Sequence, residues 1–383
     1  MNNIKLWILL SLLMGVGCSC TDIQHLDVEK EALNNLLERD KEKWAEEDKL
    51  REKNERDSIL IAEENKRLYE LYLQDLRKYK ASKHCIMFGW FNSWSAITPG
   101  AYAQLNQIPD SMDVVSIWGN CFNLDEARKK QLKEVQSKGT KVIVGWIVEN
   151  IGGQISNMKK EDWSDNPEEA VEQYAQAITD SILKYGYDGF DLDYEPPYVS
   201  PFKDGNHCGD WPKRWKDDPS YPAKWPEDWQ KDWAITKPLI SCHKDDNKEL
   251  ENLFFKTLRE KLGNDKMINI NGAIHWLSAE SAQYFDYYVA QSYEGQYATW
   301  QQPLHNPSNR YGVDVADRVI YTETFQNKKA NREKFTRYAN YVMNTLDGKA
   351  GGIGAFHINE DALDSNDYRN VRAAISIMNP PIK

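Results

Sequence analysis

The segment DGFDLDYE, residues 188–195, alternates acidic side chains with large apolar ones. Successive side chains of a β-strand point to opposite faces, so Asp191, Asp193 and Glu195 share one face of the predicted strand. The phenylalanine, leucine and tyrosine between them share the other face, which suits packing beneath helices. In a closed barrel that apolar face is the outer one, because helices cover it, and the acidic face lines the interior.

Short apolar runs on both sides of this segment alternate with amphipathic stretches, which is typical of βα units and a parallel sheet. The predicted strands are His84 to Phe91, Val114 to Asn120, Lys141 to Val148, Tyr187 to Tyr194, Ile268 to Leu277, Tyr287 to Tyr293, Arg318 to Phe325 and Gly352 to Ile358. The predicted helices are Asp125 to Ser137, Pro167 to Tyr185, Asn247 to Leu262, Arg332 to Leu346 and Asp367 to Met378. Eight strands close a barrel, and no glycine-rich phosphate turn follows the first strand as in a doubly wound sheet. We therefore predict an α/β fold, a (β/α)8 TIM barrel over residues 84–383.

The composition narrows the classes of partner. The chain has 383 residues, of which 41% are hydrophobic and 28% charged, as in an ordinary globular protein. Its net charge of −11 argues against nucleic acid or anionic lipid as a partner, because phosphate groups are bound by basic patches. The 14 tryptophans and 20 tyrosines supply flat rings that stack on sugar faces, although core packing also uses such rings.

Residues 1–20 have the pattern of an export signal. Lys5 precedes an apolar run from Leu6 to Val16 that is too short to cross a bilayer. A cysteine then follows small residues and precedes polar sequence, as at the site where bacterial lipoproteins are cleaved and acylated. The spacing favours lipidation of Cys18, with Cys20 as the alternative. We expect a lipoprotein of the cell envelope, in the outer membrane or at the cell surface; secretion without a lipid is the alternative.

Residues 21–83 form a charged stretch without Pro or Gly, dense in Glu, Lys and Arg with Leu, Ile and Tyr interspersed. This composition predicts a helical segment. One interpretation is a spacer that holds the following domain away from a membrane. The other is a helical hairpin packed on the barrel. Neither interpretation gives the segment catalytic chemistry.

The acidic row of residues 188–195 is unfavourable for stability, because three carboxylates inside a barrel repel one another and lose hydration unless they share protons. Crowding and partial burial should raise the pKa of the outermost group, Glu195, and keep it protonated near neutral pH. A protonated carboxyl can donate to the oxygen of a leaving group. Asp191 and Asp193 can share a proton and move it as charge develops. The segment therefore predicts general acid catalysis.

The same segment resembles the DGxDxDxE signature of glycoside hydrolase family 18 and matches it at every fixed position. The resemblance covers the predicted barrel, residues 84–383, and not the charged segment before it. It implies a (β/α)8 fold and a retaining, substrate-assisted hydrolysis of β-linked N-acetylglucosaminides without a nucleophile from the protein. This differs from glycosidases that use two carboxylates. We expect no cofactor and no metal.

The resemblance also implies a role for each acidic residue. Glu195 would protonate the glycosidic oxygen and later act as a base toward water. The 2-acetamido carbonyl of the substrate would attack the anomeric carbon, and Asp193 would stabilise the resulting oxazolinium through its N–H. Asp191 would be the proton partner of Asp193, and Asp188 would be a structural position.

A tyrosine at the end of the sixth strand is expected in this family to donate to the acetamido oxygen. Tyr293 is the candidate in this sequence, with a buried structural tyrosine as the alternative. Chitinases of the family usually carry Met-x-Tyr-Asp at this place, whereas endo-β-N-acetylglucosaminidases that trim N-linked glycans commonly carry Gln-x-Tyr. Gln291 therefore favours the glycan-trimming branch and is predicted to bind substrate.

Other departures from the chitinase pattern agree with this branch. The third strand reads VGW at residues 144–146 in place of Ser-x-Gly-Gly, and the eighth reads AFH at residues 355–357 where chitinases place a Trp. Weaker candidates for substrate binding stand at predicted strand ends, where a core or rim position is the alternative. They are Trp90, Asn120, Trp276 and Glu323.

A long aromatic connection, residues 198–244, follows the acidic strand and holds five tryptophans. A loop of that length in a compact domain is usually functional or disordered, and its aromatic content argues against disorder. It either builds part of a glycan-binding wall over the carboxyl ends of the strands or forms a structural cap bridged by Cys208 and Cys242. Cys85 and Cys121 fall in predicted core strands and are expected to be buried thiols.

Together these patterns predict a surface lipoprotein with a family 18 barrel, which resembles the glycan-harvesting proteins of gut Bacteroidetes. The leading hypothesis is an endo-β-N-acetylglucosaminidase that hydrolyses the GlcNAc-β1,4-GlcNAc core of N-linked glycans. Its partner would be an N-glycan or glycoprotein, and the protein would contact the membrane only through its lipid anchor. A chitinase and a non-catalytic glycan-binding lipoprotein are the alternatives. The intact Glu195 argues against the second, because inactive descendants usually lose the acid first.

Overall fold

The computed structural model describes most of the chain. The described residues are 30–119, 121–148, 151–155, 158–159, 162–164, 166–195, 248–272, 274, 277–297, 315–365 and 367–380. The chain divides into two compact units, Met1–Glu70 and Leu71–Lys383, and the second contains the sheet.

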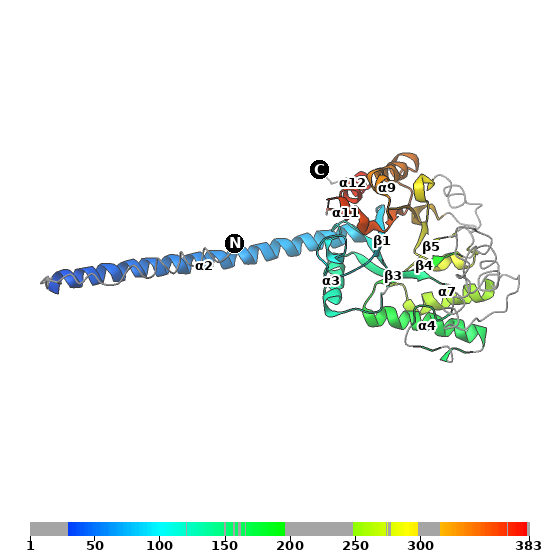
Figure 1. The fold of residues 1–383 in the computed structure, drawn as a ribbon, viewed down its shortest axis with the longest axis horizontal. Helices are drawn as coiled ribbons and strands as arrows, with labels where there is room; N and C mark the ends of the chain where they lie inside the picture. Colours follow the sequence, from blue (N-terminus) through cyan, green and yellow to red (C-terminus); the bar gives the residue numbers. More distant parts are fainter. Residues whose placement is uncertain are drawn as a thin grey trace, which may run out of the picture. The chain divides into compact units, whose positions relative to one another are not determined.

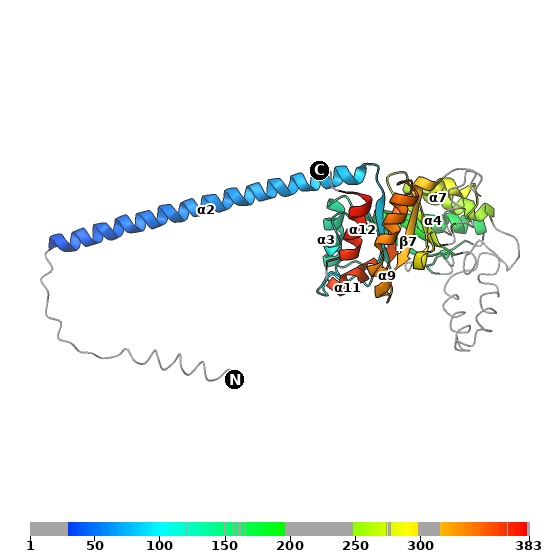
Figure 2. The ribbon, with the colours of Figure 1, turned by 90° about the horizontal axis from the view of Figure 1, so that it is seen from above.

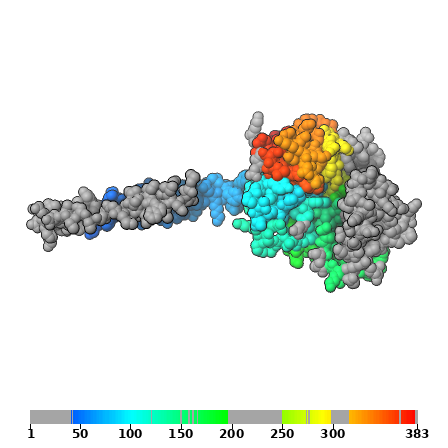
Figure 3. All heavy atoms as spheres, in the orientation of Figure 1, coloured from blue at the N-terminus to red at the C-terminus, as the bar shows by residue number. Residues whose placement is uncertain are grey.

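Eight parallel strands close into a barrel in sequence order, which confirms the predicted fold (Figure 1). They are β1 Ile86–Asn92, β2 Val114–Trp118, β3 Lys141–Ile147, β4 Gly189–Tyr194, β5 Met267–Gly272, β6 Tyr287–Ala290, β7 Val319–Thr324 and β8 Gly352–Phe356. The last strand pairs with the first, with Gly352 opposite Ile86. The space-filling view shows the result: the C-terminal segment, orange to red, lies directly beside the first barrel elements in cyan (Figure 3).

Helices cover the outside of the strands. The longer ones of the described barrel residues are α3 Glu126–Ser137, α4 Pro167–Tyr185, α7 Lys248–Leu262 and α12 Arg369–Met378, and the shorter ones are α9 Lys329–Glu333, α10 Thr336–Asn340 and α11 Ala362–Ser365. Single turns of 3-10 helix are η1 Leu105–Gln107, η4 Ser281–Tyr284, η5 Tyr293–Gly295, η6 Ala316–Arg318 and η8 Ile358–Asp361. Helices α4 and α7 lie side by side on the barrel (Figures 1 and 2).

Helix α4 shows how local sequence sets these bounds. The side chain of Asn166 accepts hydrogen bonds from the first backbone amides, and Pro167 occupies a position where no amide is needed. The helix ends at Gly186, which has a φ of 75° and closes the last turn in the left-handed conformation. The helix then leads directly into β4, so these caps fix where the acidic strand begins.

The predicted helix from Arg332 to Leu346 is wrong as one continuous element. The segment consists of the end of α9, then α10, and then a π-helical turn at Tyr341–Thr345. Arg332 explains the break after α9, because its buried guanidinium donates to Glu360 at 3.2 Å and to Asp364 at 3.1 Å. These bonds fix the end of α9 against the segment after β8.

The two faces of β4 separate as predicted. Outside the barrel, the ring of Phe190 lies 4.5 Å from that of Trp146, whose Nε1 donates to Tyr174 of α4 at 3.2 Å. The hydroxyl of Tyr194 donates to the buried Glu251 of α7 at 2.8 Å. The carboxylates therefore occupy the interior, above a smaller apolar cluster. That cluster consists of Ile86, Phe88, Trp90, Val114, Ile143, Val289 and Ile320.

Helix α2, Lys30–Ala81, is one uninterrupted helix of 52 residues, so the predicted helical character of this segment is confirmed. A hairpin would need a turn within it, and that interpretation is therefore wrong for residues 30–81. Within the second unit the end of α2 contacts the barrel: Tyr72 donates to Asp110 at 2.7 Å, and Arg77 donates to the carbonyl of Ser137 at 2.9 Å. The spacer role remains a prediction.

Several predictions fall on residues outside the described ranges. They are the export signal with Cys18 and Cys20, and the 198–244 connection with Cys208 and Cys242. Cys85 and Cys121 are buried free thiols, as predicted. Among the described helices, none combines the length and the apolar character that a membrane span requires.

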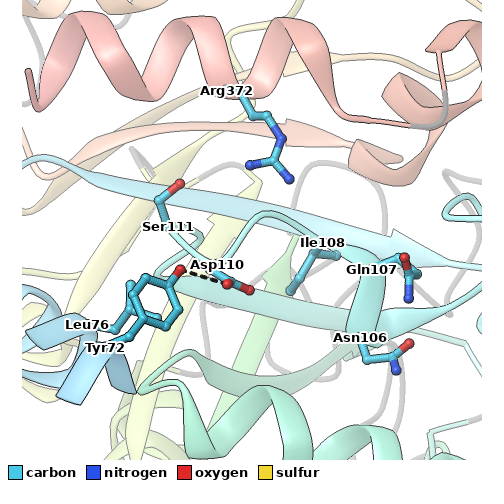
Figure 4. Close-up of a pocket in the computed structure, with 8 residues that line it drawn as sticks. All are labelled: Tyr72, Leu76, Asn106, Gln107, Ile108, Asp110, Ser111 and Arg372. Carbon is cyan, nitrogen blue, oxygen red and sulfur yellow. Dashed lines mark hydrogen bonds between the residues drawn. The ribbon is translucent and has the colours of Figure 1, made fainter. Parts of the chain in front are cut away.

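A cavity of about 340 Å³ lies between the end of α2, the loop before β2 and α12. Arg372 points toward the loop that carries Asp110 and Ser111, and Tyr72 closes another side (Figure 4). Because that loop precedes β2, the cavity lies at the amino ends of the strands. The acidic residues stand at the carboxyl end of β4, so this cavity is not part of the site they form.

Candidate active site

The acidic side chains meet polar residues of the neighbouring strand at the carboxyl end of β4. In the register of the two strands Asp191 is opposite Asn269, and Asp193 is opposite Asn271. In a barrel of this kind the carboxyl ends of the strands carry the active site. The asparagines thus extend the polar row from β4 to β5 on the inner face.

Asp191 is fully buried and held by two neutral donors. Its Oδ2 accepts from Trp90 Nε1 at 2.6 Å, and its Oδ1 accepts from Asn271 Nδ2 at 3.1 Å. Burial raises the pKa of Asp191 to about 6, although hydrogen bonding with Ser116, Asn271 and Trp90 acts in the opposite direction. The carboxyl group is thus fixed in place and able to take up or release a proton near neutral pH.

Gly145 of β3 leaves room for this carboxyl group. A β-carbon at residue 145 would come within 3.0 Å of Asp191 Oδ2 and within 2.8 Å of the Asp191 carbonyl oxygen. The backbone of β3 can therefore approach β4 only without a side chain. This contact gives the glycine of the VGW segment a physical reason.

Asp193 is buried and lies beside the amide of Gln291. Gln291 Nε2 donates to Asp193 Oδ1 at 3.3 Å and to Asn271 Oδ1 at 3.0 Å. Because Asn271 also donates to Asp191, one chain of hydrogen bonds joins both aspartates to Gln291. The predicted substrate residue Gln291 is therefore part of the acidic centre itself.

Glu195 directly follows β4 and is partly buried. Burial raises the pKa of its carboxyl group, and a hydrogen bond with Gln291 lowers it, with burial the larger effect. A raised pKa keeps the proton that a general acid needs. The direction of this shift agrees with the prediction from the sequence.

Gly272, at the end of β5, packs directly against the acidic pair, and the sequence alone did not single it out. A β-carbon here would lie 2.9 Å from Asp193 Oδ1, 3.1 Å from Glu195 Cγ and 2.6 Å from the carbonyl oxygen of Tyr194. Its φ of 87° also favours glycine. One sequence signal could have pointed to this strand end. Asn269 and Asn271 are two residues apart, as Asp191 and Asp193 are, so both pairs line the inner face of the barrel.

Tyr293 lies after β6 and near the same carboxylates. Burial, followed by the charges of Asp193, Glu195 and Asp191, raises its pKa well above the usual value for tyrosine. The phenol therefore keeps its proton and can donate a hydrogen bond. Its ring stacks at 27° on Phe356 of β8, with centroids 6.3 Å apart. The structure thus brings the candidate tyrosine to the acidic centre.

Phe356 stands where the chitinase pattern has a tryptophan, and it is the middle of an aromatic group. Besides Tyr293, its ring contacts Trp118 at 6.1 Å and Trp90 at 5.9 Å, both edge to face. Trp118 and Phe356 are both partly exposed at the carboxyl ends of their strands. Flat partly exposed rings beside buried carboxylates form a surface on which a sugar ring can rest.

Two of the weaker substrate candidates have other partners in the structure. Trp90 is 1% exposed and donates to Asp191, which gives it a positioning role. Glu323 is 0% exposed and accepts from the amides of Glu294 and Thr324. Side chains with so little exposed area offer no surface to a sugar. Asn120 and Trp276 lie outside the described residues.

Comparison with known families agrees with this site. The family model described as glycoside hydrolase family 18, BT1044-like, matches residues 52–209, which include the whole acidic segment. The match begins within α2. The expectation that the resemblance excludes the charged segment is therefore wrong for residues 52–83.

Solved structures share the fold over most of the chain. A selenomethionine form of BT1044 with a glutamate-to-glutamine substitution has a TM-score of 0.61 and 24% identity, covering 81% of this chain and 92% of that one. The endo-β-N-acetylglucosaminidase from Cordyceps militaris, in apo form, has a TM-score of 0.51 and 17% identity, covering 80% and 95%. A double variant of it, in complex with fucosyl-N-acetylglucosamine-Asn, has a TM-score of 0.52 with the same identity and coverage.

No curated protein sequence matches the chain. Because these solved structures are only 24% and 17% identical to the chain, their similarity supports the barrel fold and does not identify the substrate. The assignment therefore rests on the family model together with the complete DGFDLDYE segment on the fourth strand of that barrel. On these grounds residues 52–209 of the chain are similar to glycoside hydrolase family 18.

Proposed function

We propose that this protein is an endo-β-N-acetylglucosaminidase that hydrolyses the bond between the two core N-acetylglucosamines of N-linked glycans. The observation that carries the proposal is the contact of Gln291 with Asp193 at 3.3 Å. In the chitinase pattern a methionine takes this place and cannot donate to the aspartate. The amide therefore supports the glycan-trimming branch over a chitinase.

In the proposed reaction Glu195 donates its proton to the glycosidic oxygen while the bond from the anomeric carbon to that oxygen breaks. The carbonyl oxygen of the substrate's 2-acetamido group forms a new bond to the same carbon, which gives an oxazolinium. The raised pKa of Glu195 keeps the donated proton available at the start. Glu195, now ionised, then takes a proton from water, and the water oxygen opens the oxazolinium with overall retention.

Asp193 and Tyr293 act on the acetamido group in this scheme. The Asp193 carboxylate accepts from the acetamido N–H, and the Tyr293 hydroxyl donates to its oxygen, which turns that oxygen toward the anomeric carbon. Asp191, with a pKa of about 6, exchanges a proton with Asp193 as positive charge develops on the oxazolinium. Trp90 and Asn271 hold Asp191 in place during this exchange.

Two solved structures of one enzyme with a similar fold support the choice of substrate. The Cordyceps militaris enzyme is named an endo-β-N-acetylglucosaminidase, and one of its structures holds fucosyl-N-acetylglucosamine-Asn. That ligand contains the N-acetylglucosamine linked to asparagine, which is the part left behind when the core bond is cut. The comparison is one of folds, so the substrate needs a direct test.

The test compares the chain without residues 1–20 and its Glu195→Gln variant on a panel of N-glycoproteins and on chitin oligomers, with products read by mass. We expect glycan release that leaves one N-acetylglucosamine on the protein. The variant should be slower by about 1,000-fold or more, because general acid catalysis contributes on that order. Cleavage of chitin alone would make the protein a chitinase. Binding without cleavage would make it a glycan-binding protein.

We also propose that the chain is anchored through a lipid on Cys18 or Cys20 and exposed at the cell surface. The apolar run and the cysteine context of residues 6–20 support this proposal. Metabolic labelling with palmitate, followed by comparison of Cys18→Ser and Cys20→Ser, identifies the acylated residue. Labelling that survives both substitutions, or its absence from the natural sequence, would contradict the anchor.

A further inference from the structure

The turn that carries Tyr293 has an unusual backbone conformation. Glu294 has a φ of 60° and Gly295 has a φ of 82°, so two consecutive residues lie in the left-handed region. For glutamate this conformation is unfavourable, because its β-carbon crowds the backbone. Such a turn persists only where its surroundings hold it. The contacts around residues 292–295 should therefore reveal what holds it.

Glu323 of β7 holds the turn from below. Its fully buried carboxylate accepts from the backbone amide of Glu294 at 2.6 Å through Oε1. The same oxygen accepts from the amide of Thr324 at 2.9 Å and from Asn331 Nδ2 at 3.3 Å. The residue directly after Tyr293 is thus tied to the barrel wall by a charged hydrogen bond, which is stronger than a neutral one.

Helix α10 holds the turn from the side with two consecutive residues. Arg337 forms an ion pair with Glu323 Oε2, and Tyr338 donates to the carbonyl of Ser292. The Tyr338 hydroxyl also accepts from the amide of Gly295 at 3.1 Å. The carbonyl of Ser292 and the amides of Glu294 and Gly295 are therefore bound by side chains of β7 and α10.

Gly295 lets Arg337 lie directly on the turn. A β-carbon at residue 295 would come within 3.2 Å of the Arg337 Cζ and Nη1 atoms. The guanidinium thus lies against the turn backbone and also pairs with the carboxylate that binds the Glu294 amide. A buried ion pair by itself adds little stability compared with apolar packing. Its location around this turn indicates a more specific role.

We propose that Glu323 and Arg337 are positioning residues that hold the Tyr293 turn so that the phenol stays beside Asp193 and Glu195. The proposal rests on the proposed function for the catalytic role of Tyr293. It assigns to Glu323 a role different from the substrate contact expected from its position at a strand end. Neither residue touches the substrate in this role.

The test uses Glu323→Gln and Arg337→Lys in the full chain. Glutamine keeps the shape of Glu323 but presents an NH2 group to either the Glu294 amide or Arg337, both of which are donors. We expect kcat to fall by about 10- to 100-fold while KM changes by less than about threefold, because misplaced catalytic groups reduce the rate more than ground-state binding. The backbone amides of Glu294 and Gly295 should exchange hydrogen at least about tenfold faster.

Asp286→Asn is the matched control. Asp286 stands before β6, at the end of that strand away from Tyr293, and like Glu323 it pairs with an arginine and accepts from the backbone of a neighbouring segment. It accepts from the amide of Ile268 at 2.7 Å and from Arg259 at 2.7 Å. Its substitution should leave kcat and the exchange of the 294 and 295 amides within about twofold of the natural protein, even where the protein becomes less stable.

A double substitution separates positioning from general weakening. If Glu323 acts through the phenol, Glu323→Gln added to Tyr293→Phe should lower kcat by less than about threefold further. Independent, multiplying effects of the two substitutions would overturn the proposal, as would unchanged exchange of the turn amides in Glu323→Gln. If the natural protein hydrolyses no glycan, the proposed function fails, and the exchange measurement still decides whether Glu323 holds the turn.

Discussion

Two fully buried carboxylates of this barrel, Asp191 and Glu323, are held in different ways. Asp191 has neutral partners, among them Trp90 and Asn271, and a pKa raised to about 6. Glu323 has the guanidinium of Arg337 as its partner, together with backbone amides. Both sit in strands of the barrel, and both are 0% exposed.

The difference lies in what each environment stabilises. Neutral donors fix the position of Asp191 but leave its ionised form costly, so its proton is exchangeable near neutral pH. Glu323 is instead paired with a cation and serves as an anchor for the backbone amides of Glu294 and Thr324. Within one barrel, the presence or absence of an arginine thus separates a group suited to proton transfer from a group suited to positioning.

The largest expected effect is on kcat, and it differs between Gly272, which packs against Asp193, and Gly295, which packs against Arg337. Gly272→Ala should lower kcat by about 100-fold, because its β-carbon would meet the Tyr194 carbonyl at 2.6 Å and displace Asp193. Gly295→Ala should lower kcat by less than about tenfold, since the end of the flexible Arg337 side chain can move away. Steady-state kinetics of both variants checks this order.

The two glycines are a matched pair for backbone strain, with φ values of 87° and 82°. Each substitution should therefore cost about 1–2 kcal/mol of stability through the left-handed conformation. Urea unfolding of the two variants provides the control. Equal kinetic losses at equal stability would show that the acidic centre tolerates displacement and would contradict the packing argument for Gly272.

The next effect is on the free energy of unfolding. Replacing the carboxylate by an amide should change it in opposite directions at Asp191 and Glu323. The folded-state pKa of Asp191, about 6, lies above the value of about 3.9 for an unfolded chain. The stabilising contribution of its proton is fully present below about pH 4 and is lost as pH rises through about 6. The ionised group then costs about 3 kcal/mol at neutral pH.

Asp191→Asn should therefore stabilise the fold at pH 7.5 by about 1 kcal/mol, after the loss of one hydrogen bond from Trp90 or Asn271. Glu323→Gln should destabilise it by about 2 kcal/mol, because Arg337 loses its counter-charge while it is 31% exposed. Urea unfolding at pH 7.5 and pH 4 measures both. A gain for Asp191→Asn that persists at pH 4 would contradict the assignment to ionisation.

The smallest effect concerns Gln291 and the acid. Its hydrogen bond lowers the pKa of Glu195 against the larger effect of burial, so Gln291→Met should raise that pKa further. Activity that needs protonated Glu195 would then persist to higher pH, with the basic limb of kcat/KM displaced upward by about half a unit. Gln296→Met, at an exposed position nearby, is the control and should leave the limb in place. A basic limb that moves to lower pH in Gln291→Met would contradict the expected effect of Gln291 on the pKa of Glu195.

The sequence predicted the parts of the site that follow from local alternation. The inner face of residues 191–195 was accessible in this way, because a strand's side chains alternate whatever surrounds it. The eight strands followed from short apolar runs separated by amphipathic helical stretches. Tyr293 and Gln291 followed from a family resemblance at the end of the sixth strand. The structure places both beside Asp193.

What remained hidden depends on contacts between distant strands. Gly272 and Asn271 contribute to the site because β5 pairs with β4. The register of this pairing cannot be deduced from the sequence of either strand. Trp90 and Glu323 stood at strand ends as expected, but their partners lie on other elements. The break between α9 and α10 likewise depends on Arg332 reaching Glu360, a residue after β8.

The seam between β1 and β8 bears on how the protein is made. Ile86 pairs with Gly352, and Asn379 donates to the carbonyl of Cys85 at 2.9 Å, so the first strand is secured by the last residues of the fold. A growing chain cannot close the barrel until β8 has been synthesised, and until then β1 presents an unpaired edge. Translation that stops before residue 352 therefore leaves a product with two open sheet edges, prone to association, instead of a smaller working domain.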